Sequence, residues 1–378
     1  MHVLRRMKLT KVLCSAAIGL LAMSAASAEP SFKIGGFGTV GGAVTGNEDT
    51  QFRNGLDQWS GTDKHLDLFQ DTKLGLQGTI NFTSDFSVTS QLLGKRREDQ
   101  DMDINFEWLY AQYTGISGFD FKLGRVVLPA FLVSDARFVG YSSPWVRVPT
   151  LVYSMLPFST VDGGQVSYRT SIGPAIASFQ FTHGHSASNI FVTSAVPIPF
   201  VGTIYVPAVI ETNSPKVNGI NASIEWGDWT LRVGEVRSNV KFNLRDVGPL
   251  PSFTDTFKEA GIQYDNGQFV VMSEYVKRTT KPELYDSNGW YLGTGYHFGS
   301  VMPYVIASQF KLKTDNPNGK ASKGLAVGAR YDFAKNLALK GEFARYDTND
   351  TLIFTDNVRP AAYDKKVNML SVTLDFVF

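Results

Sequence analysis

The chain alternates apolar and polar side chains over much of its length, with a period of two residues. In the last segment, the apolar side chains that share one side are Leu370, Val372, Leu374, Phe376 and Phe378. Such a period is typical of a β-strand with one apolar and one polar face. We find no long stretch with a convincing helical period, so the pattern predicts an all-β fold.

Seven short turns separate pairs of alternating segments. They lie at residues 83–85, 117–118, 172–174, 227–228, 265–267, 299–300 and 334–336. Their residues are mainly those that accept turn dihedral angles. Longer polar loops are expected at residues 46–64, 241–256, 279–288, 314–320 and 347–366. Seven hairpins with one further strand at each end predict a 16-stranded antiparallel barrel, with short turns on one side and long loops on the other.

The polar faces of several segments carry charges that a dry core would not tolerate. Arg169, Arg232, Arg330 and Lys340 alternate with apolar neighbours that point the other way. A lipid-facing Arg or Lys at mid-depth costs about 2–4 kcal/mol, so these side chains must face water. A transmembrane β-barrel therefore fits better than a soluble β-sandwich. Sixteen strands are enough to enclose an aqueous channel.

The first 28 residues have the order of a secretory signal peptide, with Met1 or Met7 as the start. Four basic residues lead, an apolar run follows, and Ala26-Ser27-Ala28 ends the segment. We expect cleavage after Ala28 and a single barrel domain over residues 29–378. Of the 36 Lys and Arg, 32 remain in the mature chain against 35 Asp and Glu. No nucleic-acid partner is expected from this balance. The single cysteine lies in the signal segment, and we predict no cofactor and no metal site.

The segment from Val126 to Gly164 is too long for a hairpin and too apolar for a solvated loop. Four prolines break regular strand pairing within it. The inner wall of the barrel is the nearest surface on which it can lie, where it would narrow the bore.

The sequence FKLGRVVLPAF followed by PWVRVPTLVYSMLPFSTVDGG resembles the third-loop region of the Gram-negative trimeric porins. The whole plan, from IGGFGTVGG to the terminal Phe378, is similar as well. The resemblance implies a homotrimer in the outer membrane, with an inward-folded third loop over residues 127–163 as a constriction. It also implies a C-terminal signal, Phe376 and Phe378, that the barrel-assembly machinery reads. Outer-membrane lipid, lipopolysaccharide and small hydrophilic solutes are the other implied partners.

Fixed charges on the wall and loop of such a pore select permeants by size and sign. The candidate pore residues are Lys95, Arg97, Arg125, Asp135, Arg137, Tyr141, Arg147, Asp162, Arg169, Arg232, Arg330 and Lys340. The family pattern places acids on the loop and bases on the wall. This loop also carries two arginines, which predicts a mild anion preference. The alternative is that several arginines pair with carboxylates such as Glu107, Asp162 or Glu225 and only hold the loop in place.

The predicted function is passive diffusion of small hydrophilic solutes and ions. A substrate-selective porin, for a small organic acid or a less polar solute, is the alternative. The uncharged segment 190–210 is expected as an external loop that latches subunits or lines the entrance. An outer-membrane enzyme is a remote alternative, because no nucleophile motif accompanies the histidines. Gly36–Gly41 match a dinucleotide-binding pattern but lack the helix that this motif requires. We therefore expect no enzymatic activity.

Overall fold

The computed structural model describes residues 29–48, 50–97, 102–198, 202–283, 285–313, 321–347, 353–356 and 366–378. Within these ranges, the side chains of residues 193–207, 355 and 356 are not described. The expected signal peptide, the expected loop 314–320 and most of the expected loop 347–366 lie outside the described residues.

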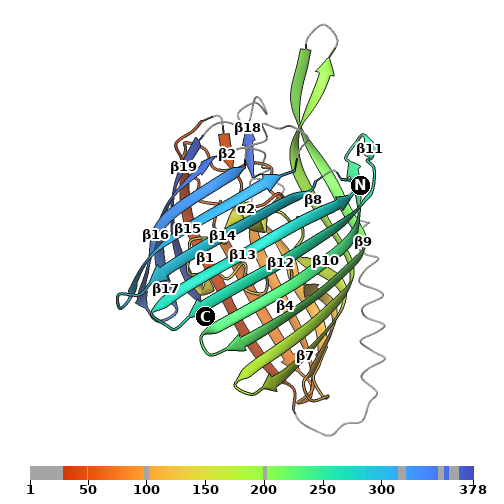
Figure 1. Ribbon diagram of the computed structural model, residues 1–378, viewed down its shortest axis with the longest axis vertical. Helices are drawn as coiled ribbons and strands as arrows, with labels where there is room; N and C mark the ends of the chain where they lie inside the picture. Colours follow the sequence, from red (N-terminus) through yellow and green to blue (C-terminus); the bar gives the residue numbers. More distant parts are fainter. Residues whose placement is uncertain are drawn as a thin grey trace.

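Sixteen long antiparallel strands form the barrel in the described part of the chain (Figure 1). They are β1 (Ser31–Thr45), β3 (Lys73–Asn81), β4 (Phe86–Arg96), β5 (Met102–Tyr113), β6 (Phe119–Val127), β7 (Thr160–Ile172), β8 (Ala175–Ile198), β9 (Gly202–Trp226), β10 (Trp229–Leu244), β12 (Phe253–Asp265), β13 (Phe269–Lys281), β14 (Ser287–Tyr296), β15 (Val301–Leu312), β16 (Ser322–Ala334), β17 (Leu337–Asp347) and β19 (Lys366–Val377).

Smaller elements lie in the loops. They are β2 (Thr50–Phe52), β11 (Gly248–Pro249), β18 (Phe354–Asp356), the 3-10 helix η1 (Gly140–Ser142) and the short helix α2 (Thr150–Tyr153). β2 pairs with β18 near the rim that carries the long loops (Figure 1). No helix among the described residues is long and apolar enough to cross a membrane.

The first and last strands close the ring. β1 pairs with β3 along one edge and with β19 along the other, with Val40 opposite Leu374. The two remaining neighbours of the closing strands, β17 and β4, continue the same antiparallel order. This closure leaves each long strand with two partners and confirms the predicted 16-stranded barrel. A two-layer sandwich would instead have edge strands with a single partner.

The strands carry apolar side chains outside and polar side chains inside, as the alternation predicts. On β10, Leu231 and Val233 are exposed on the outer surface, whereas Arg232 between them is directed into the barrel. On β17, Leu339 and Phe343 are exposed, whereas Lys340 is fully buried. Large apolar groups on the outside and charges on the inside reverse the order found in soluble proteins, and lipid is the solvent that suits this surface.

All seven predicted short turns join neighbouring antiparallel strands. Gly173 and Gly227 adopt positive φ angles of 57° and 56° at two of them, a conformation that glycine accepts without steric cost. Aromatic pairs lie beside the turns, such as Trp229 with Tyr264, whose ring centroids are 4.6 Å apart. Their position fits the girdle of aromatic residues that such barrels carry at the membrane interface.

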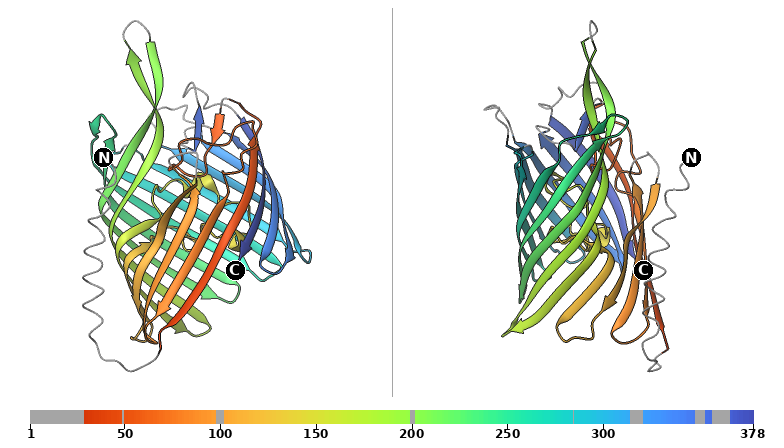
Figure 2. Two further views of the ribbon diagram at one scale, coloured as in Figure 1. Left: turned by 180° about the vertical axis from the view of Figure 1, so that it is seen from behind. Right: turned by 90° about the vertical axis from the view of Figure 1, so that its right-hand side faces the viewer.

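The uncharged segment 190–210 lies beyond the rim of the barrel, where an external loop was expected, but most of it forms paired strands. It continues β8 and β9, which pair from Ile190 opposite Ile210 to Ile198 opposite Gly202. The two strands rise as a ribbon well above the rim of the barrel (Figures 1 and 2). The segment is rich in Val, Ile and Thr, which favour strands. Prolines are tolerated because a two-stranded ribbon has unpaired outer edges.

Candidate functional site

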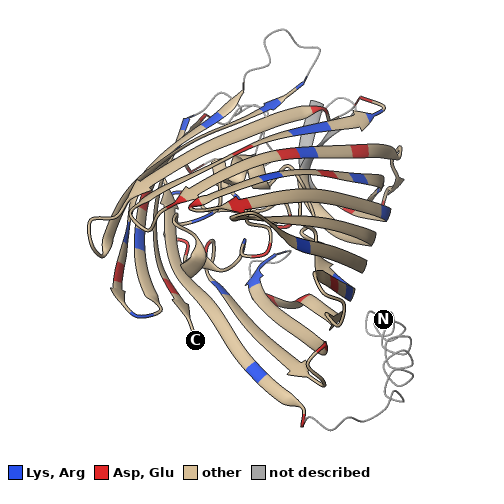
Figure 3. Cartoon of the chain, turned by 60° about the horizontal axis from the view of Figure 1, so that its bottom comes forward, with Lys and Arg blue, Asp and Glu red and all other residues tan. Residues whose placement is uncertain are grey.

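The segment between β6 and β7, residues 128–159, lies inside the ring of strands, where it is yellow in Figure 2, and Figure 3 looks into the same interior. Inward-facing cations of the wall donate hydrogen bonds to its backbone. The Arg232 guanidinium donates to the carbonyl oxygen of Pro129. The Lys340 ammonium donates to the carbonyl oxygen of Gly140 over 2.7 Å. The fixed charges of the wall thus replace the water that these carbonyl groups would otherwise bind.

Aromatic packing holds the same segment from within. The Trp145 ring contacts Tyr304 of β15, with centroids 5.2 Å apart. It also covers Gly293 of β14, where an added Cβ would lie 2.7 Å from the ring. The Tyr153 hydroxyl donates to the buried carboxylate of Glu274 of β13 over 2.5 Å. The loop therefore fills the bore on the side of β13–β15 with a dry, close-packed core.

An open cavity of about 1070 Å³ remains on the other side of the bore. Its walls are the loop 128–159, the first loop between β1 and β3, and inward faces of strands from β3 to β10. Its charged lining residues are Lys73, Lys95, Arg96, Arg97, Arg125, Arg137, Arg147, Lys241, Asp57, Asp71, Asp103, Glu107 and Glu211. Charged, hydroxyl and amide groups dominate this lining, so the cavity is suited to hydrated solutes.

Twelve residues were predicted to line the pore, and the structure brings five of them to this cavity. These are Lys95, Arg97, Arg125, Arg137 and Arg147. Lys95 and Arg125 come from strands, Arg97 directly follows β4, and the other two come from the loop, so they converge only because the loop folds inward. Arg125 is paired with Asp162 through two contacts of 2.6 and 2.7 Å, which leaves it only partly available to a solute.

The other predicted pore residues lie elsewhere in the described structure. Arg330 donates to the carbonyl oxygen of Tyr141 over 2.8 Å, and Arg232 and Lys340 hold the loop as described above. Asp135 is exposed on the loop outside this cavity lining. Arg169 pairs with Glu225 near the short turn after β7. The geometry of Arg125 and Arg169 therefore matches the alternative in which arginines pair with nearby carboxylates.

The first loop was expected to be an external polar loop, but it folds across the mouth of the barrel. The Leu56 carbonyl oxygen accepts a hydrogen bond of 2.9 Å from the Phe191 amide of β8. Arg53 donates to the Phe191 carbonyl oxygen over 2.8 Å. The rings of Trp59 and Phe191 meet edge to face at 5.2 Å. The inward path of this loop could have been predicted from the apolar residues within QFRNGLDQWS, because a fully solvated loop would expose them to water.

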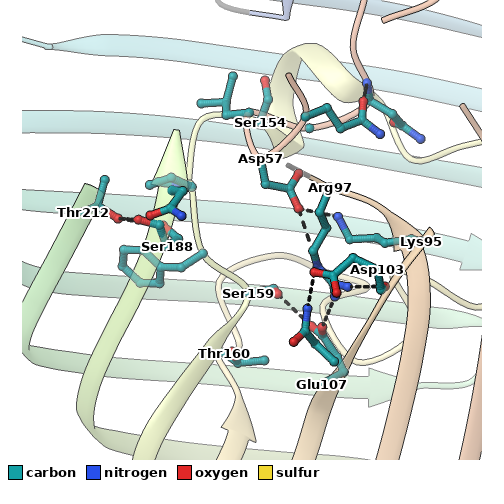
Figure 4. A pocket seen from close by; sticks show the side chains of 18 of the residues that line it. Asp57, Lys95, Arg97, Asp103, Glu107, Ser154, Ser159, Thr160, Ser188 and Thr212 are labelled. Carbon is teal, nitrogen blue, oxygen red and sulfur yellow. Dashed lines mark hydrogen bonds and ion pairs between the residues drawn. The ribbon is translucent and has the colours of Figure 1, made fainter. Parts of the chain in front are cut away.

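This crossing places Asp57 in the cavity, a residue that our reading of the sequence did not single out. Its Oδ2 atom lies 2.5 Å from Lys95 Nζ and 4.0 Å from Arg97 Nε (Figure 4). Arg97 also lies 3.6 Å from the carboxylate of Glu107, which accepts a hydrogen bond from Ser159 over 2.8 Å. Burial by itself raises the pKa of Asp57, but the positive charges of Lys95 and Arg97 outweigh it and hold the pKa below its ordinary value.

Arg147 joins the third loop to two other parts of the chain. Its guanidinium makes two contacts of 3.0 and 2.6 Å with Asp71 of the first loop. It also reaches Glu342 of β17 at 3.3 Å and Ser371 of β19 at 2.6 Å. Burial by itself raises the pKa of Asp71, but the charge and hydrogen bonds of Arg147 lower it by more. Arg147 therefore acts mainly by holding the third loop to the first loop and to the barrel wall.

Comparison with protein families settles the class of this barrel. A model of the Gram-negative porin family matches residues 14–351 of the chain. The chain belongs to the Gram-negative porin family. This porin is accordingly a β-barrel of the Gram-negative outer membrane, a non-enzymatic channel for passive diffusion. No curated protein matches the porin by sequence.

Solved porin structures share the fold at low sequence identity. The anion-selective porin from Comamonas acidovorans is 14% identical, with a TM-score of 0.57, and the match covers 93% of this chain and 100% of that one. OmpF of Salmonella typhi, solved with daunomycin, is 13% identical, with a TM-score of 0.58 and coverage of 92% and 97%. The trimer form of OmpT from Vibrio cholerae is 12% identical, with a TM-score of 0.57 and coverage of 92% and 99%.

Proposed function

We propose that this porin is a general diffusion channel with a mild preference for anions, and that residues 127–163 form its constriction. The charge of the cavity carries the proposal: of its described lining side chains, eight are basic and five are acidic. In a narrow bore an excess of fixed positive charge attracts anions and repels cations. The anion-selective porin from Comamonas acidovorans, which has the same fold, is consistent with this proposal.

Recording in planar bilayers tests this proposal. The reconstituted porin is expected to give stepwise currents. In a potassium chloride gradient, its reversal potential is expected to lie between zero and the equilibrium potential of chloride. Arg137→Glu reverses one charge of the cavity lining and is expected to shift the reversal potential towards potassium. Lys335→Glu, in the exposed short turn between β16 and β17, makes the same charge change outside the cavity lining and serves as control. Equal shifts in both variants would contradict a selectivity set at this cavity.

We also propose that the porin works as a homotrimer surrounded by lipid and lipopolysaccharide. The trimer form of OmpT supports this, because its barrel has the same fold. The exposed apolar side chains of β1 and β19, such as Ile34, Val40 and Leu370, need a cover of lipid or a second subunit. Small hydrophilic solutes remain the proposed permeants. Cleavage of the signal peptide after Ala28 would make Glu29 the first residue found by sequencing of the mature protein.

Phe376 and Phe378 are proposed as the signal for the barrel-assembly machinery. The ring of Phe378 is 63% exposed on the outer surface, while its backbone exchanges two hydrogen bonds of 2.9 Å with Gly36. Phe378→Ala keeps those backbone bonds and is expected to reduce the heat-sensitive trimer in membranes. The free energy of unfolding of the refolded variant should differ from that of the wild type by no more than about 1 kcal/mol, because the ring faces lipid on the outer surface. Phe333→Ala, which removes an exposed ring beside another short turn, is the control. Equal trimer yields from both variants would argue against a terminal signal.

A further inference from the structure

Three cations from two elements converge at one side of the cavity. Lys95 of β4 and Arg97, which follows that strand, approach the same carboxylate oxygen of Asp57. Arg137 of the third loop lies with its guanidinium carbon 5.4 Å from the centre of the Phe138 ring, and Lys95 Nζ lies 5.6 Å from the same centre. The aromatic face therefore brings the loop cation and the wall cation together.

Two carboxylates contact these three cations among the described residues. Asp57 and Glu107 are the carboxylates in contact with Lys95 and Arg97. Arg137 forms no ion pair with any residue that the structure describes, and its hydrogen bond is to the carbonyl oxygen of Tyr153 at 3.4 Å. One of the three cations therefore has no carboxylate of its own.

Asp57 is the exchangeable part of this arrangement. It comes from the first loop and not from the barrel wall, its side chain is 29% exposed, and only its Oδ2 atom approaches the cations. By contrast, Glu107 belongs to β5, is buried, and is also bound by Ser159. A carboxylate on a loop can leave its partners without disturbing the barrel, whereas one on a paired strand cannot.

We propose that Lys95, Arg97 and Arg137 form a binding site for the carboxylate group of a small organic acid, and that Asp57 occupies this site when no such solute is present. This inference rests on the proposed channel function and names a substrate class for its cavity. Asp57 is then an internal competitor: it keeps the cations neutralised at rest and yields to a solute carboxylate during passage. The Leu56 backbone stays bonded to Phe191 in this exchange, so only the side chain of Asp57 has to move away from the cations.

The test measures binding of acetate, with acetamide as its neutral counterpart. The full-length porin is recorded in planar bilayers with chloride as the carrier ion, and the reduction of chloride current by added potassium acetate gives an apparent Kd. Asp57→Asn removes the competitor and is expected to lower this Kd about fivefold, the factor that corresponds to roughly 1 kcal/mol. Arg137→Gln removes a cation of the site and is expected to raise it by a similar factor. Acetamide should change the current equally in all variants.

Glu211→Gln is the matched control, because it removes one negative charge from the lining of the same cavity away from the three cations. An equal change in Asp57→Asn and Glu211→Gln would show a general charge effect and overturn the proposal. If Asp57→Asn fails to assemble, Arg137→Gln decides, and an unaltered Kd refutes the site. These results all presuppose stepwise currents. Their absence from the folded wild-type protein would instead refute the proposed channel function.

Discussion

Replacement of Arg147 by methionine is expected to destabilise the folded porin by about 3–5 kcal/mol, the usual cost of removing one partner from a buried ion pair. The Arg147 side chain is 4% exposed, and its partners Asp71 and Glu342 are buried as well. Without the guanidinium, two buried carboxylates would lose the cation that both of them contact. Unfolding by urea in detergent, followed by tryptophan fluorescence, measures the loss.

The control for this prediction is Arg169→Met. Arg169 and Glu225 also form an ion pair, but their side chains are 58% and 46% exposed, so the expected loss is about 0–1 kcal/mol. The double variant Arg147→Met with Asp71→Asn should recover part of the stability, because one of the unpaired charges is then gone. If Arg147→Met lowers the free energy of unfolding no more than Arg169→Met does, the ion pairs of Arg147 contribute little to stability.

Replacement of Lys340 by methionine is expected to release the third loop from the wall. The Lys340 ammonium is fully buried and donates to the carbonyl oxygens of Gly140, Ser143 and Trp145 over 2.7, 2.7 and 3.1 Å. It also lies 3.1 Å from the carboxylate of Asp375. Its loss would remove the cation that pairs with the buried Asp375 carboxylate, and one hydrogen bond to each of three loop carbonyl groups, again at a cost of about 3–5 kcal/mol. Single-channel recording should show a noisy open state with variable conductance.

Lys323→Met provides the comparison, because Lys323 is an exposed lysine of the neighbouring strand β16. It should leave both the open-state noise and the unitary conductance close to those of the wild type. If Lys340→Met conducts as quietly as Lys323→Met and with the same unitary conductance, Lys340 is not needed to hold the loop. The aromatic contacts of Trp145 and the hydrogen bonds from Arg232 and Arg330 would then be sufficient.

The two-residue period was enough to predict which side chains point into the barrel. Lys340 and Glu342 face inward, and Leu339 and Phe343 face outward, as the alternation requires. Strand pairing turns every second side chain to the same face, so this prediction needs no knowledge of distant residues. The short turns were predictable for the same reason, because Gly173 and Gly227 carry the local backbone demand themselves.

The direction of an inward side chain did not reveal what it contacts. Arg97 and Lys340 were both predicted to face the pore and carry the same charge. Yet Arg97 lines the open cavity and Lys340 lies under the third loop. The difference depends on the path of that loop, which is set by contacts with β13–β15 far away in sequence. The long pairing of β8 and β9 beyond the rim was not predicted, although an edge without a partner accepts the prolines of this segment.

The sequence by itself determined the closed barrel, the oily outside and the charged inside, because strand period and turn residues are local properties of the chain. Only the tertiary structure decided where water can pass. The third loop fills one side of the bore, and the first loop crosses to Phe191 and brings Asp57 to Lys95. Both placements arise from packing and ion pairs between segments distant in sequence, and such contacts leave no periodic trace along the chain.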